Sequence, residues 1–413
     1  MDSHHDPSAD IMARLDQLAT IRESPRHLTR RCFTPEHRRI NDLAGGWMLD
    51  AGMKVREDAV GNVIGRYEGL VEGAPAIMLG SHLDTVIMAG KYDGGLGILS
   101  AIDCVRSLHG RGIRFDYAVE VAGFADEEGV RFQSTYLGSR ALAGTFETAL
   151  LNRPDSDGVT LAEAMREFGL DPGRIGDAVR RPDEIKCYLE VHIEQGPVLE
   201  SEGLAVGAVT AISGANRMTV TLDGTAGHAG TVPMSARQDA LIAASECVLA
   251  VEAVAPSHAG MVGTVGQMTV SPGATNVIPG RVTFSVDMRA PKDNLRRAAV
   301  AELEARMRDL AAQRSVGVSI EGTHEAVSVA CAPWIVDEIE GAMAELGQRP
   351  FRLPSGAGHD AAAMAEITDV GMIFVRCAGG ISHSPDESIT GEDAIAGARL
   401  LLQLVESIGA KKS

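Results

Sequence analysis

Short apolar segments alternate with helical patterns in the first half of the chain. Residues 76–79 are wholly apolar and end at Gly80, which is typical of a strand buried on both faces. Residues 117–125 and 187–191 have the same character, and residues 96–108 carry apolar side chains at helical spacing. Strands that alternate with helices predict an α/β layer with a mostly parallel sheet.

The pattern changes near Ser213, where apolar and polar residues begin to alternate. Beyond it the chain predicts strands and helices in the order βαββαβ, at residues 217–222, 234–254, 263–270, 281–289, 294–313 and 316–321. This order is the split βαβ arrangement of a small independent domain. The α/β pattern resumes at about residue 327, so we expect a domain at 213–326 inserted into a first domain formed by 1–212 and 327–413.

Composition narrows the class of protein. A chain of 413 residues is too long for one ordinary core, which agrees with two domains. Its 45% hydrophobic and 23% charged residues are usual for a globular enzyme. The net charge of −18 argues against nucleic acid and anionic membrane surfaces as partners. Because no apolar run reaches about eighteen residues, we expect no membrane span.

The cysteines indicate the compartment. Six cysteines lie far apart in the sequence, and none forms a Cys-x-x-Cys pair. This usage favours buried free thiols in a reducing compartment over disulfides or a thiolate metal site. The first residues lack the apolar stretch of a signal peptide. We therefore expect a cytoplasmic protein.

Each of the predicted strands of the first domain runs into polar residues. His82 follows the first strand, Glu127 and Glu128 follow the second, and His192 follows the third. In open α/β sheets, ligands bind at the carboxyl ends of the strands. Histidine nitrogens and carboxylate oxygens are common ligands of zinc and related divalent ions. We therefore expect a metal site at this edge of the sheet.

Two loops supply further candidate ligands. Asp93 lies eleven residues after His82, in a loop rich in glycine, and His383 lies in a Ser-His-Ser loop after two glycines. A single histidine after a strand is usually structural, so the metal interpretation depends on the combination of motifs. Asp84 strengthens it, because a ligating histidine normally donates its other N–H to a carboxylate.

The adjacent acids Glu127 and Glu128 are open to two interpretations. They can be a solvated pair of loop charges, or they can divide two roles between them. Neighbouring residues in extended backbone point to opposite sides. One carboxylate can therefore bind a metal ion while the other acts as the general base.

The inserted domain and the segment after it carry candidates for substrate binding. His228 lies on a Gly-His-Ala-Gly turn, and Asn276 can both donate and accept hydrogen bonds. Arg289, on the polar side of an alternating strand, suits a carboxylate, although a structural pair with Asp287 is the alternative. Gly358 belongs to a glycine turn before a helix, whose free N–H groups can hold an anion.

Together these motifs resemble the M20 metallopeptidase superfamily, specifically its hydantoinase/carbamoylase branch. That branch contains N-carbamoyl-L-amino-acid hydrolases, allantoate amidohydrolases and β-ureidopropionases. The resemblance extends from about residue 10 to the C-terminus, and a histidine at 192, where the peptidase branch has an acid, points to the carbamoylases. The motifs that carry it are Ser81-His82-Leu83-Asp84-Thr85, Asp93-Gly94, Asp126-Glu127-Glu128-Gly129, His192-Ile193-Glu194-Gln195-Gly196, Gly227-His228-Ala229-Gly230 and Ser382-His383-Ser384.

The resemblance implies a zinc-peptidase-like α/β/α catalytic domain with an inserted ferredoxin-like βαββαβ lid and dimerisation domain. It also implies two divalent metal ions per subunit, with Zn, Mn, Co and Ni all compatible with the ligands. The first ion would lie on His82, Asp93 and His192, and the second on Asp93, Glu128 and His383, so that Asp93 bridges. Glu127 would be the general base, and Asp84 would orient His82.

By the same resemblance, four groups would hold the substrate: Gln195, Asn276, Arg289 and the Gly358 backbone. Arg289 would bind the substrate carboxylate. His228 would come from the partner subunit of a homodimer and stabilise the oxyanion.

The implied reaction is hydrolysis of a C–N bond in the ureido or carbamoyl group of a carboxylate substrate, with release of ammonia and CO2. The N-terminal half favours allantoate, while N-carbamoyl-L-amino-acid hydrolase and β-ureidopropionase are alternatives. A dipeptidase or aminoacylase is a more distant one. From a different class, the chain could be a metal-dependent binding protein without catalysis, but the presence of Glu127 beside all five ligands argues against it.

Overall fold

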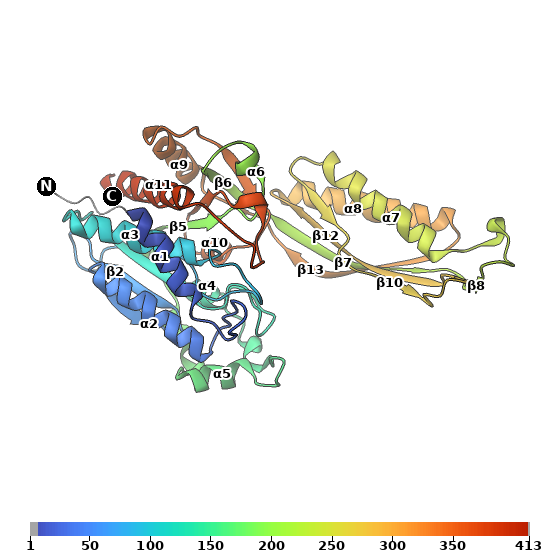
Figure 1. Cartoon of the computed structure of the whole chain (residues 1–413), viewed down its shortest axis with the longest axis horizontal. Helices are drawn as coiled ribbons and strands as arrows, with labels where there is room; N and C mark the ends of the chain where they lie inside the picture. The colour runs from blue at the N-terminus through green and yellow to red at the C-terminus, as the bar shows by residue number, and fades with distance from the viewer. Residues whose placement is uncertain (1–6, 412–413) are drawn as a thin grey trace. The chain divides into compact units, whose positions relative to one another are not determined.

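The computed structural model describes residues 7–411 and divides into two compact units (Figure 1). Unit 1 comprises Met1–Thr210, Cys331–Leu353 and Gly358–Ser413. Unit 2 comprises Ala211–Ala330 and the short segment Pro354–Ala357. The inserted domain was predicted at 213–326, and the sequence pattern gave no sign of the segment at 354–357.

A nine-stranded sheet forms the centre of unit 1. Its strands lie in the order β1-β2-β4-β3-β5-β16-β6-β14, and β15 also pairs with β6. The strands are β1 Lys54–Glu57, β2 Val63–Tyr67, β3 Ala76–His82, β4 Ala118–Phe124, β5 Ile185–Ile193, β6 Val206–Ile212, β14 Val329–Ala330, β15 Arg352–Ser355 and β16 Val370–Val375. Every residue of β3 and β4 is buried, as their wholly apolar sequences predict.

The sheet is mixed, so the prediction of a mostly parallel sheet is correct only for its centre. Strands β4, β3, β5 and β16 pair in parallel. On either side, β2 pairs with β4 and β6 pairs with β16 in antiparallel fashion. At the outer edge, β1 and β2 are joined only by residues 58–62. That connection is too short for a parallel crossover, so the pair must be antiparallel.

Helices cover both faces of this sheet. They are α1 Pro7–Ala19, α2 Pro35–Asp50, α3 Gly95–Gly110, α4 Leu137–Leu142, α5 Leu161–Phe168, α6 Val198–Ser201, α9 Pro333–Glu345, α10 Asp360–Met364 and α11 Gly391–Ala410. Along β5, Val191 faces Gly397 of α11, whereas the carboxylate of Glu190 accepts the backbone N–H of Ala361 in α10. Because side chains alternate along a strand, β5 lies between two helical layers, as an α/β/α domain requires.

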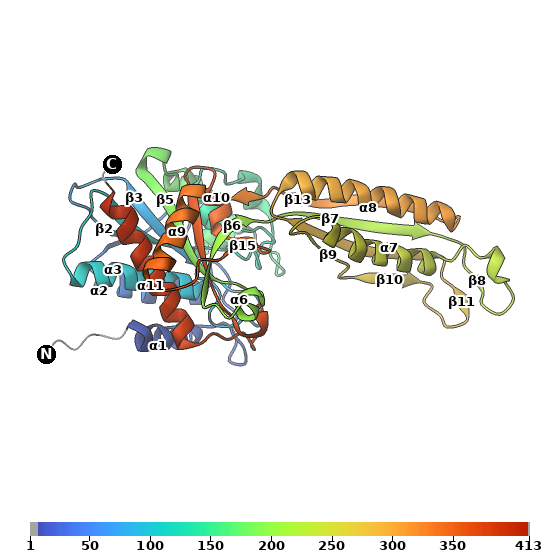
Figure 2. The same ribbon diagram turned by 90° about the horizontal axis from the view of Figure 1, so that it is seen from above.

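Unit 2 is a five-stranded sheet in the order β10-β12-β7-β13, with β9 also on β12, and all its pairs are antiparallel. Two helices pack on it (Figure 2). The elements are β7 Gly214–Asp223, α7 Ala240–Val254, β9 Val262–Thr264, β10 Met268–Ser271, β12 Arg281–Ala290, α8 Asp293–Gln313 and β13 Gly317–Ala326. This confirms the inserted βαββαβ domain.

Two details of unit 2 differ from the prediction. The strand expected at 263–270 is two short strands, because Thr264 pairs with Asp287 while Met268 pairs with Phe284. Between these two pairs, three residues on one strand (265–267) face two on the other (285–286), which is the mark of a bulge. The helix expected from about 234 begins at Ala240, where the Asp239 side chain caps its first turn.

One segment of the described chain, Ala240–Ser257, is long and apolar enough to cross a membrane by length and composition. It contains Glu246 and Glu252, which interrupt the apolar run in the sequence. Ala243 and Cys247 on one side of this helix are fully buried in the core of unit 2. This is the packing of a core helix.

Candidate metal centre

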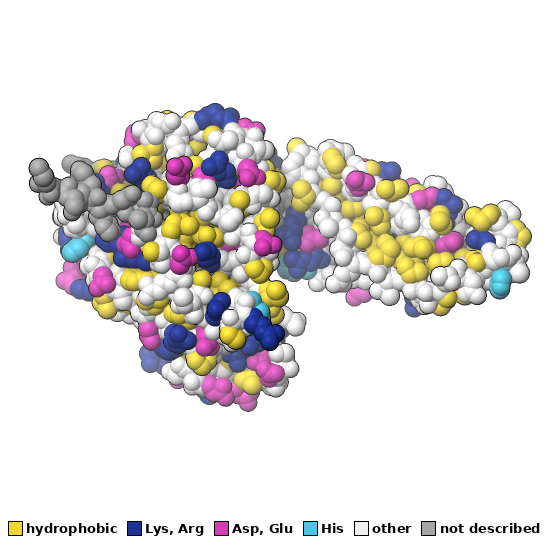
Figure 3. Space-filling model, in the orientation of Figure 1, with side chains coloured by type: hydrophobic (Ala, Val, Ile, Leu, Met, Phe, Trp, Pro, Cys, Tyr) yellow, Lys and Arg dark blue, Asp and Glu magenta, His cyan; other side chains and the backbone are white. Residues whose placement is uncertain are grey.

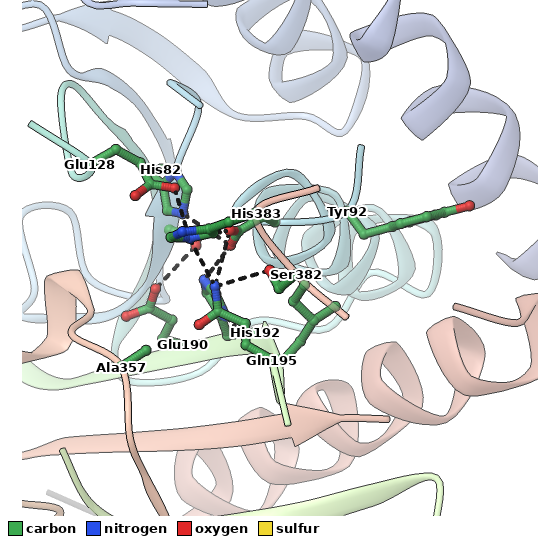
Figure 4. A network of polar contacts seen from close by, with 12 residues as sticks. His82, Tyr92, Glu128, Glu190, His192, Gln195, Ala357, Ser382 and His383 are labelled. Carbon is green, nitrogen blue, oxygen red and sulfur yellow. Dashed lines mark hydrogen bonds and ion pairs between the residues drawn. The ribbon is translucent and has the colours of Figure 1, made fainter. Parts of the chain in front are cut away.

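The predicted ligands of unit 1 converge at the carboxyl ends of three adjacent strands (Figure 4). His82 is the last residue of β3, His192 is near the end of β5, and Glu127 follows β4. Asp93 lies between β3 and α3, in a loop held tightly against His82. Gly94 makes this contact possible, since its φ is 66° and an added Cβ would lie 2.6 Å from the His82 ring.

His82, Asp93 and His192 form a buried trio. Their ligand atoms all lie within 4.8 Å of one another. Nε2 of His192 is 2.9 Å from Oδ1 of Asp93, and Nε2 of His82 is 3.5 Å from the same oxygen. The structure therefore brings together the three side chains that the resemblance assigns to a first ion.

The hydrogen bonds of the two imidazoles fix their tautomers. Nδ1 of His82 lies 3.0 Å from the carbonyl oxygen of Asp84, and Nδ1 of His192 lies 2.9 Å from that of Ile193. A carbonyl only accepts, so in a neutral ring Nδ1 is the donor and Nε2 presents a lone pair. Both lone pairs point at Oδ1 of Asp93, an oxygen that is buried and has no hydrogen-bond partner within residues 7–411. Three lone pairs around one small space fit a bound cation.

The charges at this trio are strongly coupled. Burial lowers the pKa of His82, but the nearby carboxylates of Asp93 and Glu127 outweigh it and raise the pKa well above its ordinary value. The charge of His192 holds the pKa of Asp93 well below its usual range in spite of burial. A cation bound among these atoms would replace the protons that otherwise balance the negative charge of Asp93.

Asp93, Glu128 and His383 form a second trio with ligand atoms within 4.8 Å. Nε2 of His383 is 3.3 Å from Oδ2 of Asp93 and 3.4 Å from Oε1 of Glu128. Oδ1 of Asp93 faces the first trio and Oδ2 faces the second. A carboxylate in this orientation can bridge two ions, and the donor set of imidazole and carboxylate suits divalent metals.

Asp84 holds the His82 ring, as the resemblance implies, but through its backbone carbonyl and not through its carboxylate. Its carboxylate Oδ1 is 3.7 Å from Nδ1 of His82, which is too far for a hydrogen bond. The backbone carbonyl of Asp84 holds the ring instead. Its carboxylate accepts the backbone N–H groups of Glu127 at 3.0 Å and Glu128 at 3.2 Å. Asp84 therefore fixes the acidic loop as well as the histidine.

Glu127 lies beside both trios. One of its carboxylate oxygens is within 4.8 Å of ligand atoms of His82 and Glu128. Burial, with the charges of Glu128 and Asp360, raises the pKa of Glu127 well above its ordinary value, against the opposing charge of His82. A carboxylate with a raised pKa beside candidate metal ligands can act as a general base.

The side chain of Gln195 contacts two members of the second trio. Its Nε2 donates to Oδ2 of Asp93 at 3.1 Å and to Oγ of Ser382 at 3.2 Å, and it is 3.3 Å from Nε2 of His383 (Figure 4). Gln195 and His383 both have left-handed backbone, with φ of 57° and 54°. Such strain is typical of functional loops.

Gly358 lies against a tyrosine. A Cβ at this position would be 1.7 Å from the hydroxyl oxygen of Tyr136, so no residue with a side chain fits without a rearrangement. Tyr136 itself has a left-handed φ of 64°. The backbone of Gly358 is thus held at close range by a side chain that sequence reasoning did not identify.

His228 and Asn276 come together in unit 2, although they are far apart in the sequence. His228 ends β8 (Gly227–His228), which pairs with β11 (Val277–Ile278). The backbone N–H of Ala229 donates to the carbonyl of Asn276 at 3.0 Å. This small sheet lies at one end of unit 2 (Figure 2), and β12 begins at Arg281, three residues after the end of β11. Its pattern of two-residue strands is too short to be read from sequence.

Arg289 lies at the other end of β12. Its guanidinium donates to both oxygens of Asp287, at 3.0 and 2.9 Å, and to the carbonyl of Gly356 at 2.8 Å. The structural pairing with Asp287 is therefore present. Arg289 also lines an open hollow of about 750 Å³ on the sheet of unit 2, together with Arg217, Asp287 and Gly356.

Three buried residues near the trios had no predicted role. His359 packs edge-on against His192 with ring centroids 4.4 Å apart, and burial lowers its pKa well below the ordinary value. Glu190 accepts from Ser81 at 3.0 Å behind the first trio. Glu387 accepts the backbone N–H of Asp93 at 3.1 Å. The only sequence signal for these residues was their place within or beside the quoted motifs.

Comparison with known proteins agrees with this geometry. Residues 78–407 match the family model described as Peptidase family M20/M25/M40. The chain is 43% identical over 396 residues to an N-carbamoyl-L-amino acid amidohydrolase of Geobacillus stearothermophilus, covering 96% of this chain and 97% of that protein. It is 41% identical over 429 residues to an allantoate deiminase of Arabidopsis thaliana, covering 96% and 82%.

A solved structure extends the comparison to the whole fold. The hydantoinase/carbamoylase family amidase from Burkholderia multivorans superposes with a TM-score of 0.93 at 34% identity, and 98% of each chain is covered. The chain is therefore a member of peptidase family M20/M25/M40 and, within it, of the hydantoinase/carbamoylase amidases.

Proposed function

We propose that this protein is a metal-dependent amidohydrolase that cleaves a ureido or carbamoyl C–N bond in a carboxylate substrate and releases ammonia and CO2. One observation carries the proposal. The two oxygens of Asp93 face two separate trios of potential ligands, and Glu127 lies beside both. The first ion would be held by His82, Asp93 and His192, and the second by Asp93, Glu128 and His383.

The reaction needs a water nucleophile and proton transfer. Two divalent ions, when bound, would lower the pKa of water and polarise the substrate carbonyl. Glu127 would take a proton from the attacking water and return it to the leaving nitrogen. The carboxylate of Asp84 keeps Glu127 in place by accepting the backbone N–H of Glu127 at 3.0 Å. The raised pKa of Glu127 suits a group that must both accept and donate a proton.

Each unit carries side chains or backbone groups that we propose to bind substrate. The Gly358 backbone and the Gln195 amide would contact the ureido end. Gln195 donates to Asp93, and Gly358 packs on Tyr136, whose backbone N–H donates to the carbonyl of Glu127 at 3.1 Å. Arg289 would bind the substrate carboxylate, with Asp287 holding the plane of its guanidinium. A planar guanidinium fixed in this way is suited to bidentate contact with a carboxylate.

We propose that His228 and Asn276 act in the active site of a partner subunit. Arg281 and Arg289 are eight positions apart in β12, which is roughly 26 Å of extended chain. The β8–β11 sheet lies beyond Arg281, so within one unit His228 and Arg289 are too far apart to hold the same small substrate. A homodimer removes this conflict, because the β8–β11 sheet of each subunit can contribute its residues to the active site of the other.

The helical face of unit 2 also favours a dimer. Ile242 and Leu249 on α7 are 43% and 61% exposed. Figure 3 shows hydrophobic side chains gathered over the helices of this unit. An apolar surface of this kind commonly marks a protein interface.

All six cysteines are free and buried, which supports the proposal of a cytoplasmic enzyme.

Two substrate classes are supported by named relatives. We favour allantoate, the compound in the name of the 41% identical allantoate deiminase of Arabidopsis thaliana. N-Carbamoyl-L-amino acids are the second candidate, because a relative at 43% identity bears that activity in its name. Both are carboxylates with a ureido group, so both satisfy the same arrangement of Glu127, Arg289 and the two trios.

The test is ammonia release by metal-loaded protein on a panel of compounds. The panel holds allantoate, ureidoglycolate, N-carbamoyl-β-alanine and several N-carbamoyl-L-amino acids, with dipeptides and N-acetyl amino acids as controls. We expect turnover only of ureido compounds. Hydrolysis of the control compounds alone would contradict the proposal and indicate a peptidase or acylase.

A further inference from the structure

Glu387 connects two loops that carry proposed metal ligands. Its side chain is 4% exposed. Oε1 accepts the backbone N–H groups of Tyr92 at 3.0 Å and Asp93 at 3.1 Å. Oε2 accepts the hydroxyl of Ser382 at 2.8 Å, next to His383. One buried carboxylate thus binds segments that are almost 300 residues apart in the chain.

The fit around Glu387 is close. A Cβ on Gly90 would lie 2.3 Å from Cβ of Glu387, so the Asp93 loop packs directly on this side chain. Buried backbone N–H groups need an acceptor, and Glu387 supplies it for two in succession. These bonds fix the backbone from which the Asp93 carboxylate projects, and hence the direction of its two oxygens.

The two trios depend on this anchor to different degrees. His82 and His192 are on buried strands and are both 2% exposed, so their positions are set by the sheet. His383 is on a loop, with a side chain that is 49% exposed and left-handed backbone. The neighbouring Ser382 joins this loop to Glu387 and also accepts from Gln195 at 3.2 Å.

We propose that Glu387 is a positioning residue for the second metal ion. It holds the backbone of Asp93 directly and the loop of His383 through Ser382, and it does so by accepting hydrogen bonds rather than by touching substrate. This inference rests on the proposed function, since it presumes that Asp93, Glu128 and His383 bind an ion. Supporting groups of this kind typically affect metal affinity by about 10- to 100-fold.

The test is calorimetric titration of chelator-treated protein with Mn²⁺, comparing wild type with Glu387→Ala and Glu387→Gln. We expect wild type to bind two ions per subunit. Glu387→Ala should bind the weaker of these ions about 10- to 100-fold less tightly, with the tighter ion little changed. Glu387→Gln should retain most of the affinity, because its amide oxygen can accept both backbone N–H groups and its amide N–H can donate to Ser382.

Asp155→Asn is the matched control. Like Glu387, Asp155 accepts two backbone N–H groups through one oxygen, from Asp157 and Val159, and a side-chain donor, Arg131, through the other. Its loop carries no proposed ligand. We expect this variant to lose some thermal stability and to keep both metal affinities. Loss of the weaker ion in Asp155→Asn as well would overturn the inference, because the effect would then be general.

Ser382→Ala tests the same connection if Glu387→Ala does not fold. It removes the link between Glu387 and the His383 loop, together with the bond that Ser382 accepts from Gln195, and leaves the bonds of Glu387 to the Asp93 loop in place. We therefore expect weaker binding of one ion and unchanged binding of the other. A folded Glu387→Ala or Ser382→Ala with wild-type affinity for both ions would overturn the inference alone. Wild-type protein that binds fewer than two ions would overturn the proposed function and this inference with it.

Discussion

The carboxylate of Asp84 accepts the backbone N–H of Glu127 at 3.0 Å. This bond ties the proposed general base to the strand that carries His82. The other oxygen of Asp84 accepts from the next residue, Glu128, at 3.2 Å. The proposed base and a proposed ligand are therefore held by one side chain, so their relative position does not depend on a bound metal ion.

Glu127→Gln should keep both metal ions and lose most turnover. Glutamine has nearly the same shape, and Asp84 contacts only the backbone of residue 127, so the loop stays in place. The loss of proton transfer should lower kcat by roughly 10²- to 10⁴-fold. Steady-state kinetics with metal analysis of the same preparation checks this. Full activity in a variant with two ions would show that Glu127 is not the base.

Arg289→Ala should raise KM for carboxylate substrates by roughly 10- to 100-fold, because a charged hydrogen-bonded contact is lost. The control is Arg217→Ala. Arg217 also pairs with Asp287, at 3.1 Å, but its side chain is 53% exposed. We expect little change in KM for that variant. Equal effects of the two substitutions, or no effect of either, would refute a specific clamp at Arg289.

Mixing inactive protomers tests whether His228 acts across an interface. His228→Ala and Glu127→Gln homodimers should each be nearly inactive. After subunit exchange, half of the dimers are mixed, and one of their two sites combines an intact Glu127 with an intact His228. Activity should then recover to about a quarter of wild type. If native mass spectrometry demonstrates subunit exchange and activity does not recover, His228 does not act in the active site of the partner subunit.

Metal binding should depend on pH. Burial and the charge of Asp93 raise the pKa of Glu128 to about 7, and the hydrogen bond to Asp93 raises the pKa of His383. Below pH 7 these groups hold protons that an ion must displace. Affinity for the second ion should therefore fall by about tenfold or more per pH unit below 7 and level off at high pH.

Calorimetry in buffers of different ionisation enthalpy measures the protons released. About one proton or more should leave per second ion at pH 6, and fewer at pH 9. An affinity for the second ion that is constant between these values would contradict the assignment of Glu128 and His383 as its ligands.

Much of the fold and of the candidate site was visible in the sequence because both are encoded locally. Buried strands such as β3 and β5 are short apolar runs, and their polar ends, His82 and His192, follow directly. Parallel neighbours in one sheet bring such ends together. The alternation over residues 281–289 likewise predicted a strand, and the observed strand β12 is buried on one side.

The remaining features depend on contacts that no local pattern records. The amide of Gln195 reaches Ser382, and the carboxylate of Glu387 reaches the loop of Asp93, across long stretches of chain. The carboxylate of Asp84 was expected on its near neighbour His82, but it binds the backbone of a loop more than forty residues away. Single hydrogen-bond acceptors of this kind leave no periodicity in a sequence.

The most direct measurement of the central claim is turnover as a function of metal content. Protein treated with a chelator is titrated with Mn²⁺ or Zn²⁺, and ammonia release from allantoate and from an N-carbamoyl-L-amino acid is followed at each step. We expect negligible activity without metal and a rise that reaches its plateau at two ions per subunit. Full activity in metal-free protein, or none on any ureido compound at two ions per subunit, would contradict it.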